Sequence, residues 1–196
     1  LEVINAYNSL LIVYKLTIDN NYDEIEALKS LYLQKNNHVF ESRIIWKIPV
    51  CYNDYYGIDL DNISKKINIK KDKIIQLHYE NTYKVCFLGF LPGFLYLSNL
   101  NKKLYFPRKV QPDLNIIKGS VGIGGNQTGV YPSTSPGGWN IIGNSPIDFV
   151  DKRNLDKISF ASPGDSIKFY PIDIKEHNYI LNNLNTYKIE SEVSND

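Results

Sequence analysis

One segment, Gly119-Ser-Val-Gly-Ile-Gly-Gly-Asn-Gln-Thr-Gly-Val-Tyr-Pro-Ser-Thr-Ser-Pro-Gly-Gly-Trp-Asn-Ile-Ile-Gly143, contains eight of the twelve glycines of this 196-residue chain. It is not of low complexity, because polar and aromatic residues are interleaved: Gln127, Thr128, Tyr131, Trp139 and Asn140. Glycine lets another group come close to the backbone. The mixture of small, polar and aromatic residues therefore suggests a surface that is shaped to contact another molecule.

The chain around this segment consists of short apolar runs separated by Gly, Pro and Asn turns. After Tyr83 these runs predict strands at 83–88, 120–123, 139–142 and 166–172. Many short strands with frequent turns favour a β-sandwich or a barrel. Two helices are predicted before them, one that follows Asp59 as its cap and one over 71–80. The predicted fold class is therefore α+β and mainly β.

The first 45 residues read as a separate, small unit. Ser9–Leu16 predicts a buried strand, and a helix follows in which apolar residues recur at helical spacing behind two acids. A polar break then places a domain boundary near residues 36–45, with a new strand at 43–50. Because the chain begins at Leu1 and contains no Met, we expect it to be a fragment.

The composition excludes several classes of protein. A hydrophobic content of 43% and a charged content of 22% are ordinary for a soluble globular protein. A net charge of +1 gives no electrostatic basis for binding nucleic acid or a membrane surface. Cys51 and Cys86 lie far apart, as expected of free thiols in a reducing compartment. There is no signal-peptide pattern, and we expect a cytoplasmic protein.

Familiar catalytic motifs are absent from the sequence. Gly124–Gly129 has the glycine spacing of a phosphate-binding loop, but Val130 and Tyr131 stand where Lys and Ser or Thr are required. The GxSxG nucleophile motif does not occur. The three histidines lack metal-ligand spacing, so we expect no metal site. His78 lies on the apolar face of its predicted helix, which is typical of a histidine in a core or an interface.

Two further segments combine turn residues with large aromatic side chains: Gly89-Phe-Leu-Pro-Gly-Phe-Leu-Tyr-Leu97 and Ser135-Pro-Gly-Gly-Trp139. Each fits a turn with packed aromatic residues. Each also fits the wall of a pocket or a patch for a partner. The composition of the two segments leaves both interpretations open.

Five motifs occur in a fixed order: Phe87–Leu97, Phe106-Pro-Arg108, Gly119–Gly124, Gln127–Pro132 and Ser135–Trp139. Together they resemble the allophanate hydrolase subunit 1 family, which includes the B subunit of 5-oxoprolinase and a Kip-type inhibitor of a sporulation histidine kinase. A related segment forms the carboxyltransferase domain, subdomains C and D, of urea carboxylase. The resemblance implies a cyclophilin-like β-barrel at residues 46–175. A small, truncated α+β domain precedes it (1–45), and a tail that includes a short helix follows it (176–196).

The resemblance also implies an activity that depends on partners. The expected function is that of the B subunit in an ATP-hydrolysing amide hydrolase, a 5-oxoprolinase, which opens 5-oxo-L-proline to L-glutamate together with A-like and C-like subunits. The isolated chain should be inactive; it carries no cofactor of its own, while ATP with Mg serves the complex. Two alternatives are a Kip-type regulator of a sensor histidine kinase and an accessory protein related to urea carboxylase or allophanate hydrolase.

Roles for single residues follow from the resemblance. Arg108, with its permanent charge and forked donors, is expected to stabilise the charge that develops when an amide is opened. The other candidate catalytic residues are Gln127, Tyr131 and His78. The residues expected to bind substrate or a partner are Phe90, Pro92, Gly93, Phe94, Tyr96, Ser120, Thr128, Pro136, Gly137, Gly138, Trp139 and Asn140. We expect Arg108, Gln127, Tyr131 and the turn 136–139 to meet at one mouth of the barrel, and Phe94, Tyr96 and Trp139 to anchor a partner.

The chain departs from the family pattern in three places. Asp113 follows Pro112 where the family commonly has arginine, and Ile116-Ile117 replaces Val-Pro. Asn144 stands where the family often has arginine after glycine. The loss of two basic residues weakens the expected binding of anions.

Overall fold

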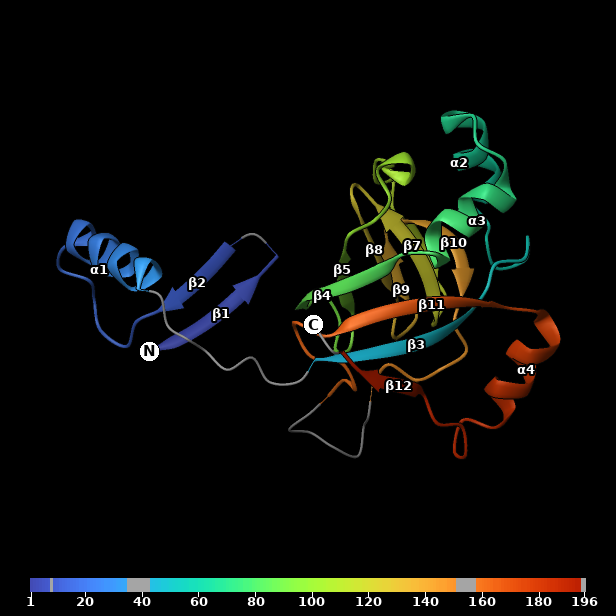
Figure 1. The fold of residues 1–196 in the computed structure, drawn as a ribbon. Helices are drawn as coiled ribbons and strands as arrows, with labels where there is room; N and C mark the ends of the chain where they lie inside the picture. The colour runs from blue at the N-terminus through green and yellow to red at the C-terminus, as the bar shows by residue number, and fades with distance from the viewer. Residues whose placement is uncertain (8, 35–42, 151–157, 195–196) are drawn as a thin grey trace. The chain divides into compact units, whose positions relative to one another are not determined.

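The structure is a computed structural model that describes residues 1–7, 9–34, 43–150 and 158–194. The chain separates into two compact units, residues 1–42 and 43–196 (Figure 1). The predicted domain boundary near 36–45 falls largely on residues 35–42, which lie outside the described residues.

The N-terminal unit contains an antiparallel hairpin and one helix. These are β1 (Glu2–Ala6), β2 (Ser9–Val13) and α1 (Asn21–Leu33). Asn20 caps α1 by accepting a hydrogen bond from the Tyr22 N–H, and the acids of the first turn favour the positive end of the helix dipole. The helix was predicted, and the structure confirms it.

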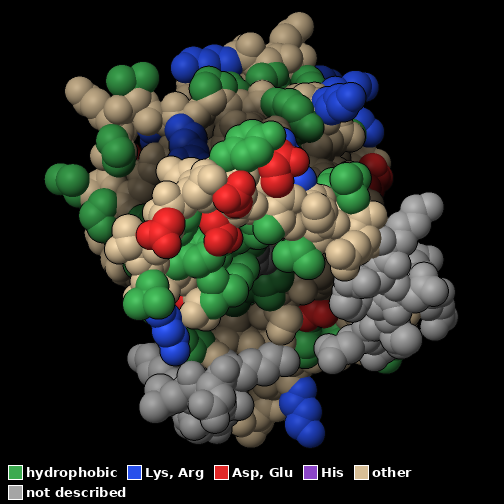
Figure 2. Space-filling model, turned by 90° about the vertical axis from the view of Figure 1, so that its left-hand side faces the viewer, with side chains coloured by type: hydrophobic (Ala, Val, Ile, Leu, Met, Phe, Trp, Pro, Cys, Tyr) green, Lys and Arg blue, Asp and Glu red, His purple; other side chains and the backbone are tan. Residues whose placement is uncertain are grey.

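The prediction that Ser9–Leu16 forms a buried strand is wrong. Leu10 and Leu11 are each 57% exposed, because two strands and one helix offer little surface against which both faces could be buried. Apolar side chains of α1, among them Leu31 and Tyr32, are exposed as well. Figure 2 shows a face of the molecule on which hydrophobic side chains lie open at the surface beside a group of acidic ones.

The second unit is a closed β-barrel, which confirms the predicted fold class. In the order in which they are hydrogen-bonded, its strands are β10 (Asn140–Asn144), β7 (Ser120–Gly124), β8 (Gln127–Val130), β5 (Leu95–Ser98), β4 (Thr82–Leu88), β11 (Ser166–Ile172) and β3 (Ile44–Cys51). A pairing of Asn144 with Cys51 joins β10 to β3 and closes the ring. The pairing of β11 with β3 is parallel, whereas the other pairings around the ring are antiparallel.

Smaller elements surround the barrel (Figure 1). They are α2 (Leu60–Ile67), α3 (Lys71–Tyr79), the 3-10 helix η1 (Lys102–Leu104), β6 (Asp113–Ile116), β9 (Ser135–Gly137), α4 (Ile174–Asn182) and β12 (Glu190–Val193). Helix α2 packs against β10, and α3 packs against β11. Strand β12 extends the sheet by pairing with the first half of β3, whose other end closes the ring. This strand was not predicted.

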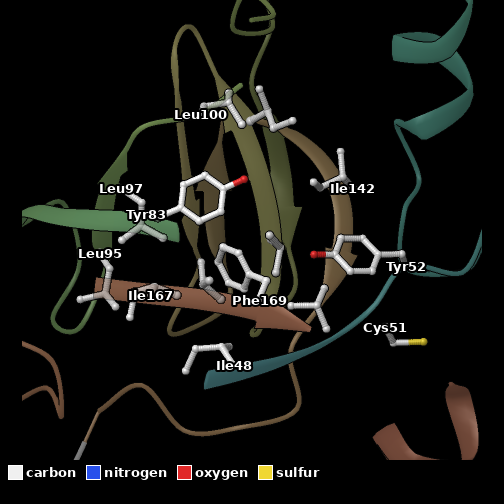
Figure 3. Close-up of a cluster of buried hydrophobic side chains, with 14 of the residues drawn as sticks. Ile48, Cys51, Tyr52, Tyr83, Leu95, Leu97, Leu100, Ile142, Ile167 and Phe169 are labelled. Carbon is white, nitrogen blue, oxygen red and sulfur yellow. The ribbon is translucent and has the colours of Figure 1, made fainter. Parts of the chain in front are cut away.

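The barrel interior is filled by aliphatic and aromatic side chains, several of which Figure 3 shows. The imidazole of His78 is fully buried as well. Its Nε2 lies 2.9 Å from Thr128 Oγ1, and Thr128 Oγ1 donates to the Gly122 carbonyl. Nε2 must therefore donate, and Nδ1 accepts from the Tyr52 hydroxyl at 2.8 Å. Burial lowers the pKa of His78 to about 3, so the ring is held neutral with both nitrogens bonded.

This buried histidine predicts a dependence of stability on pH. Between about pH 6.5 and pH 3 the unfolded chain binds a proton at His78 that the folded chain does not bind, so stability falls as the pH falls. The slope from one such group approaches roughly 1.4 kcal/mol per pH unit. In urea denaturation from pH 7 to pH 4, we expect His78→Gln to be less stable at pH 7 but to lose less stability on acidification. An acid slope equal to that of the unsubstituted protein would contradict this account.

Candidate functional site

Three glycines of the long glycine-rich segment form a flat backbone surface against which one indole ring packs. A Cβ atom at Gly124 would lie 2.7 Å from three atoms of the Trp139 ring, and one at Gly129 would lie 3.1 Å from another. Gly122 similarly faces the Cβ of Trp139. These glycines point outward, because their neighbours Val121, Ile123 and Val130 point into the barrel core. Trp139 therefore lies flat on the outer face of β7 and β8.

Phe94 and Tyr96 pack edge-on against Trp139, and Tyr131 packs in turn on Phe94, so that a second apolar core forms. We call Phe90, Phe94, Tyr96, Tyr131 and Trp139 the aromatic cluster. Phe94 lies 5.4 Å from Trp139 and 5.3 Å from Tyr131 between ring centroids, and both contacts are T-shaped. Such edge-to-face pairs add to the stability that burial gives. Phe94, Tyr131 and Trp139 are at most 4% exposed, whereas Phe90 is 58% exposed.

Arg108 lies over the indole at the surface of the cluster. Its guanidinium carbon is 5.4 Å from the Trp139 ring centroid, within the range of a cation–π interaction. The segment that carries Arg108 is held on both sides by backbone hydrogen bonds: Phe106 pairs with Gly125, and the Lys109 N–H donates to the Gly138 carbonyl at 2.7 Å. The Asn140 amide also donates to the Pro107 carbonyl. We call residues 106–111 the strap.

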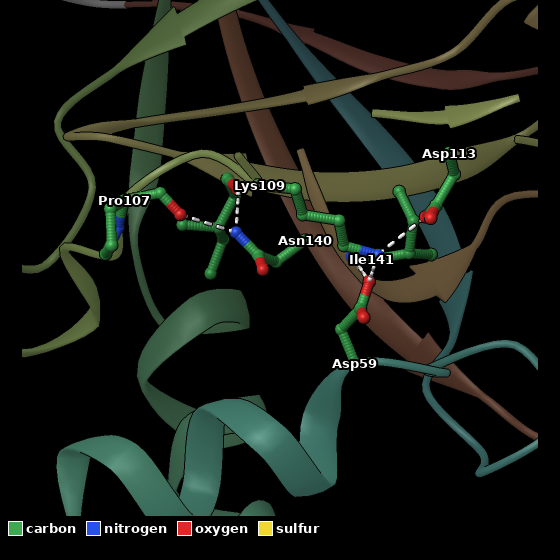
Figure 4. A network of polar contacts seen from close by, with 7 residues as sticks. Asp59, Pro107, Lys109, Asp113, Asn140 and Ile141 are labelled. Carbon is green, nitrogen blue, oxygen red and sulfur yellow. Dashed lines mark hydrogen bonds and ion pairs between the residues drawn. The ribbon is translucent and has the colours of Figure 1, made fainter. Parts of the chain in front are cut away.

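An ion-pair network fixes the strap to helix α2 and strand β10 (Figure 4). Lys109 Nζ lies 2.7 Å from Asp59 Oδ2 and 2.6 Å from Asp113 Oδ2. The same Asp59 oxygen accepts a hydrogen bond from the Ile141 N–H. Burial lowers the pKa of Lys109, but the bonds to Asp113 and Asp59 outweigh it, so the pKa is raised and the amine stays charged.

The predicted role of Asp59 as a helix cap needs correction. Asp59 occupies the N-cap position of α2, yet its side chain makes no capping hydrogen bond. The carboxylate turns toward Lys109 and the Ile141 N–H, because a cation and a donor together stabilise it more than one peptide N–H would.

The strap and α2 border a groove of about 590 Å³. Its lining residues are Asn62, Lys66, Phe106, Pro107, Arg108, Lys109, Val110, Gln111 and Asn140. Arg108 therefore belongs both to the groove and to the surface of the aromatic cluster. The contribution of α2 was not predicted, because nothing in the spacing of Asn62 and Lys66 shows which way that helix faces.

Gln127 and Tyr131 lie on the same outer face as Trp139. Gln127 pairs directly with Gly124, so its side chain leaves the sheet beside the indole. Gln127 is 8% exposed, and its Nε2 has no hydrogen-bond partner among the described residues. Burial raises the pKa of Tyr131 to about 12, although a hydrogen bond from the Trp139 backbone and the charge of Arg108 act in the opposite direction. The phenol is therefore a neutral group at physiological pH.

The structure thus brings Arg108, Gln127, Tyr131 and the turn 136–139 to one region, but this region is the outer face of β7 and β8 and not a mouth of the barrel. A Cβ at Gly137 would collide with the Tyr131 hydroxyl, so this glycine permits the approach of the ring. Pro136 is exposed beside it, and the Gly138 carbonyl accepts from the strap.

Several predicted site residues serve the fold instead. His78 and Thr128 lie in the barrel core, so a catalytic role for His78 has no support in the arrangement of the site. Ser120 is buried; its N–H donates to the Ile117 carbonyl, and its carbonyl accepts from the Tyr131 N–H. The side chain of Asn140 is bonded to two backbone carbonyls.

The expectation that Phe94 and Trp139 anchor a partner is not supported, because both are almost completely buried. In the turn 89–94, Gly93 has a φ of 82°, and a Cβ there would lie 2.8 Å from the Phe149 carbonyl oxygen. Pro92 and Phe90 are exposed, and Tyr96 is half-buried. Of the predicted anchors, only Tyr96 keeps part of its ring accessible.

Metal ligands and membrane-spanning helices were also sought in the described residues. Within 1–7, 9–34, 43–150 and 158–194, no three His, Cys, Asp or Glu side chains come together as metal ligands would. Among the helices in the same ranges, none combines the length and the apolar character needed to cross a membrane.

The closed barrel, the aromatic cluster and the strap define a carboxyltransferase-type barrel protein. Residues 1–160 match the family model "Carboxyltransferase domain, subdomain C and D", and the chain belongs to this family, as the motifs predicted. The chain is 38% identical over 170 residues to the 5-oxoprolinase B subunit of Escherichia coli O157:H7, covering 87% of this chain and 77% of that protein. It is 36% identical over 188 residues to the protein of the same name from Bacillus subtilis (strain 168), covering 90% and 78%.

A likeness among solved structures supports the fold. The urea amidolyase of K. lactis superimposes with a TM-score of 0.75 at 21% identity, over 89% of this chain and 12% of that one. At this level of identity the likeness bears on the architecture alone.

The close packing of Trp139 on these glycines predicts that one added methyl group at Gly124 changes both the stability and the fluorescence of the protein. In a Trp46→Phe background, where Trp139 is the only indole, Gly124→Ala should displace the ring, lower the stability by about 1–3 kcal/mol and shift the fluorescence emission to longer wavelength. Gly138→Ala is the control, because its Cβ would meet the nearest atom at 3.5 Å, an ordinary contact. Equal spectra and equal stability for both variants would contradict the packing role of Gly124.

Proposed function

We propose that this chain is the B subunit of an ATP-dependent 5-oxoprolinase complex, which opens 5-oxo-L-proline to L-glutamate together with A-like and C-like subunits. The observation that carries the proposal is the 36–38% identity, over most of both chains, to two proteins named as B subunits of 5-oxoprolinase. The motifs that carry the resemblance coincide with the aromatic cluster and the strap.

The geometry supports a contribution to binding and charge stabilisation by this chain. Opening a lactam ring develops negative charge on the carbonyl oxygen, and a positioned cation stabilises such charge. Arg108 is suited to this role, because the strap fixes its backbone and the indole fixes its guanidinium. The two other nearby groups, Gln127 Nε2 and the neutral phenol of Tyr131, offer hydrogen-bond donors and no negative charge.

A partner protein would complete the site. Phe90 is the exposed member of the aromatic cluster, and it has a φ of 70°, which is unfavourable for a bulky residue. Exposed aromatic side chains held in strained turns are suited to an interface, since their conformation is already fixed. We therefore assign the anchoring role to Phe90 in place of Phe94 and Trp139.

The proposal predicts a specific pattern of loss in the reconstituted complex. The chain mixed with its A-like and C-like partners should release glutamate from 5-oxoproline in the presence of ATP and Mg, and the isolated chain should not. Arg108→Ala should lower kcat by about 100-fold while the complex still assembles in gel filtration. Lys84→Ala, an exposed substitution away from the groove, is the control.

Two outcomes would contradict these assignments. Turnover by the isolated chain would remove the need for partners. Equal losses of assembly and activity in Arg108→Ala would make Arg108 an interface residue and not a catalytic one.

A further inference from the structure

The groove between α2 and the strap contains two cationic side chains, each of which lies over the face of an aromatic ring. Lys66 Nζ lies 5.7 Å from the centroid of the Phe106 ring, and Arg108 lies over Trp139. Phe106 and Trp139 are 6% and 4% exposed, so the rings are fixed parts of the core. Both cations are themselves exposed to solvent. A cation that rests on a fixed ring has fewer positions available, and it loses less entropy when it binds an anion.

The acids nearest to these cations are already engaged. Asp59 and Asp113 both bind Lys109, and their side chains are only 14% and 41% exposed. Asp61, on the same helix as Lys66, pairs with Lys71. Among the described residues, no salt bridge within 4.0 Å joins Lys66 or Arg108 to a carboxylate. Even with Asp59 and Asp113 counted, the groove residues Lys66, Arg108 and Lys109 leave one net positive charge.

The remaining polar side chains of the groove are two exposed amides, Asn62 on α2 and Gln111 at the end of the strap. Asn140, by contrast, has its amide nitrogen committed to backbone carbonyls. A groove of about 590 Å³ has room for a small molecule, and its walls are otherwise apolar. The exposed cations and amide donors thus lie around one space.

We propose that this groove binds an oxyanion, the carboxylate or phosphate group of a small molecule, between Lys66 of α2 and Arg108 of the strap. Charge-assisted hydrogen bonds from the ammonium and the guanidinium hold the anion, and the amides of Asn62 and Gln111 contribute neutral donors. The inference goes beyond the proposed function, because it assigns a binding role to α2 and concerns the chain without its partner proteins.

The experiment is a titration of the isolated full chain with sodium acetate and, separately, with inorganic phosphate. Ionic strength is kept constant with NaCl, and amide NMR shifts are recorded, including the side-chain signals of Asn62 and Gln111. Lys66→Gln is compared with Lys65→Gln, which removes the same charge from the neighbouring position, also exposed but outside the groove. Because both lysines are exposed, both variants should keep the fold, which circular dichroism checks.

We expect saturable shifts at Asn62 and Gln111, an affinity reduced about tenfold in Lys66→Gln, and an affinity within about twofold of the original in Lys65→Gln. Saturable binding of either anion with this order of affinities among the variants supports the proposal. The proposal is overturned if neither anion gives saturable shifts, or if the two variants lose affinity equally. Because no turnover is measured, this test can fail while the reconstituted complex is active, and it can succeed where the complex is inactive.

Discussion

The contact between the Trp139 indole and the backbone of β7 and β8 is the constraint on which the site depends. Only glycine at 124 and 129 allows a flat ring to lie against the sheet at this distance. Phe94 and Tyr96 pack edge-on against this ring, and the guanidinium of Arg108 lies over it. The glycine-rich segment, which suggested a surface shaped to contact another molecule, is thus first of all a packing surface. Its relation to function is indirect: the glycines position Trp139, and the Trp139 ring in turn positions the guanidinium of Arg108.

The strap depends on the same arrangement. Its two backbone anchors, Gly125 and Gly138, lie in the turn after β7 and in the turn before Trp139. Lys109 adds a third anchor that reaches across to α2 and β10 through Asp59. The pair is partly buried, since the side chains of Lys109 and Asp59 are 18% and 14% exposed. Desolvation therefore offsets much of its contribution to stability, but removing one partner is costly, because the other charge is left unpaired. The network therefore specifies the position of the strap more than it stabilises the barrel.

Much of the fold could be predicted from the sequence, and the limits have physical causes. Strands β3, β4 and β11 carry long apolar runs, and the helices α1, α2 and α3 carry apolar residues at helical spacing. By contrast, β9 has three residues and β8 has four, and their pairing is set by contacts with distant strands. Strand β12 exposes all four of its residues, so no alternation could reveal it. Closure of the ring rests on a single pairing, Asn144 with Cys51, which no local pattern encodes.

The site was predicted only in part, because it too depends on contacts between distant segments. The motifs identified Arg108 and Trp139, but they could not separate Gln127 from Thr128. Adjacent residues of a strand face opposite sides. Thr128 therefore points to His78 in the core, whereas Gln127 leaves the sheet on the side of the indole. Lys66 was not predicted, because its place in the groove follows from the packing of α2 on β10.

Asp113 and Asn144, which stand where the resemblance led us to expect arginine, both have specific partners. Asp113 binds Lys109, a pairing that an arginine at the same position would replace with repulsion. Asn144 is 3% exposed; it accepts from His177 Nε2 and donates to the Lys118 carbonyl at the point of ring closure. Both side chains therefore have their charge or hydrogen-bonding groups satisfied by neighbouring residues. Lys109 is paired with two carboxylates, whereas Lys66 and Arg108 form no salt bridge among the described residues. The uncompensated positive charge of the groove therefore lies on α2 and the strap.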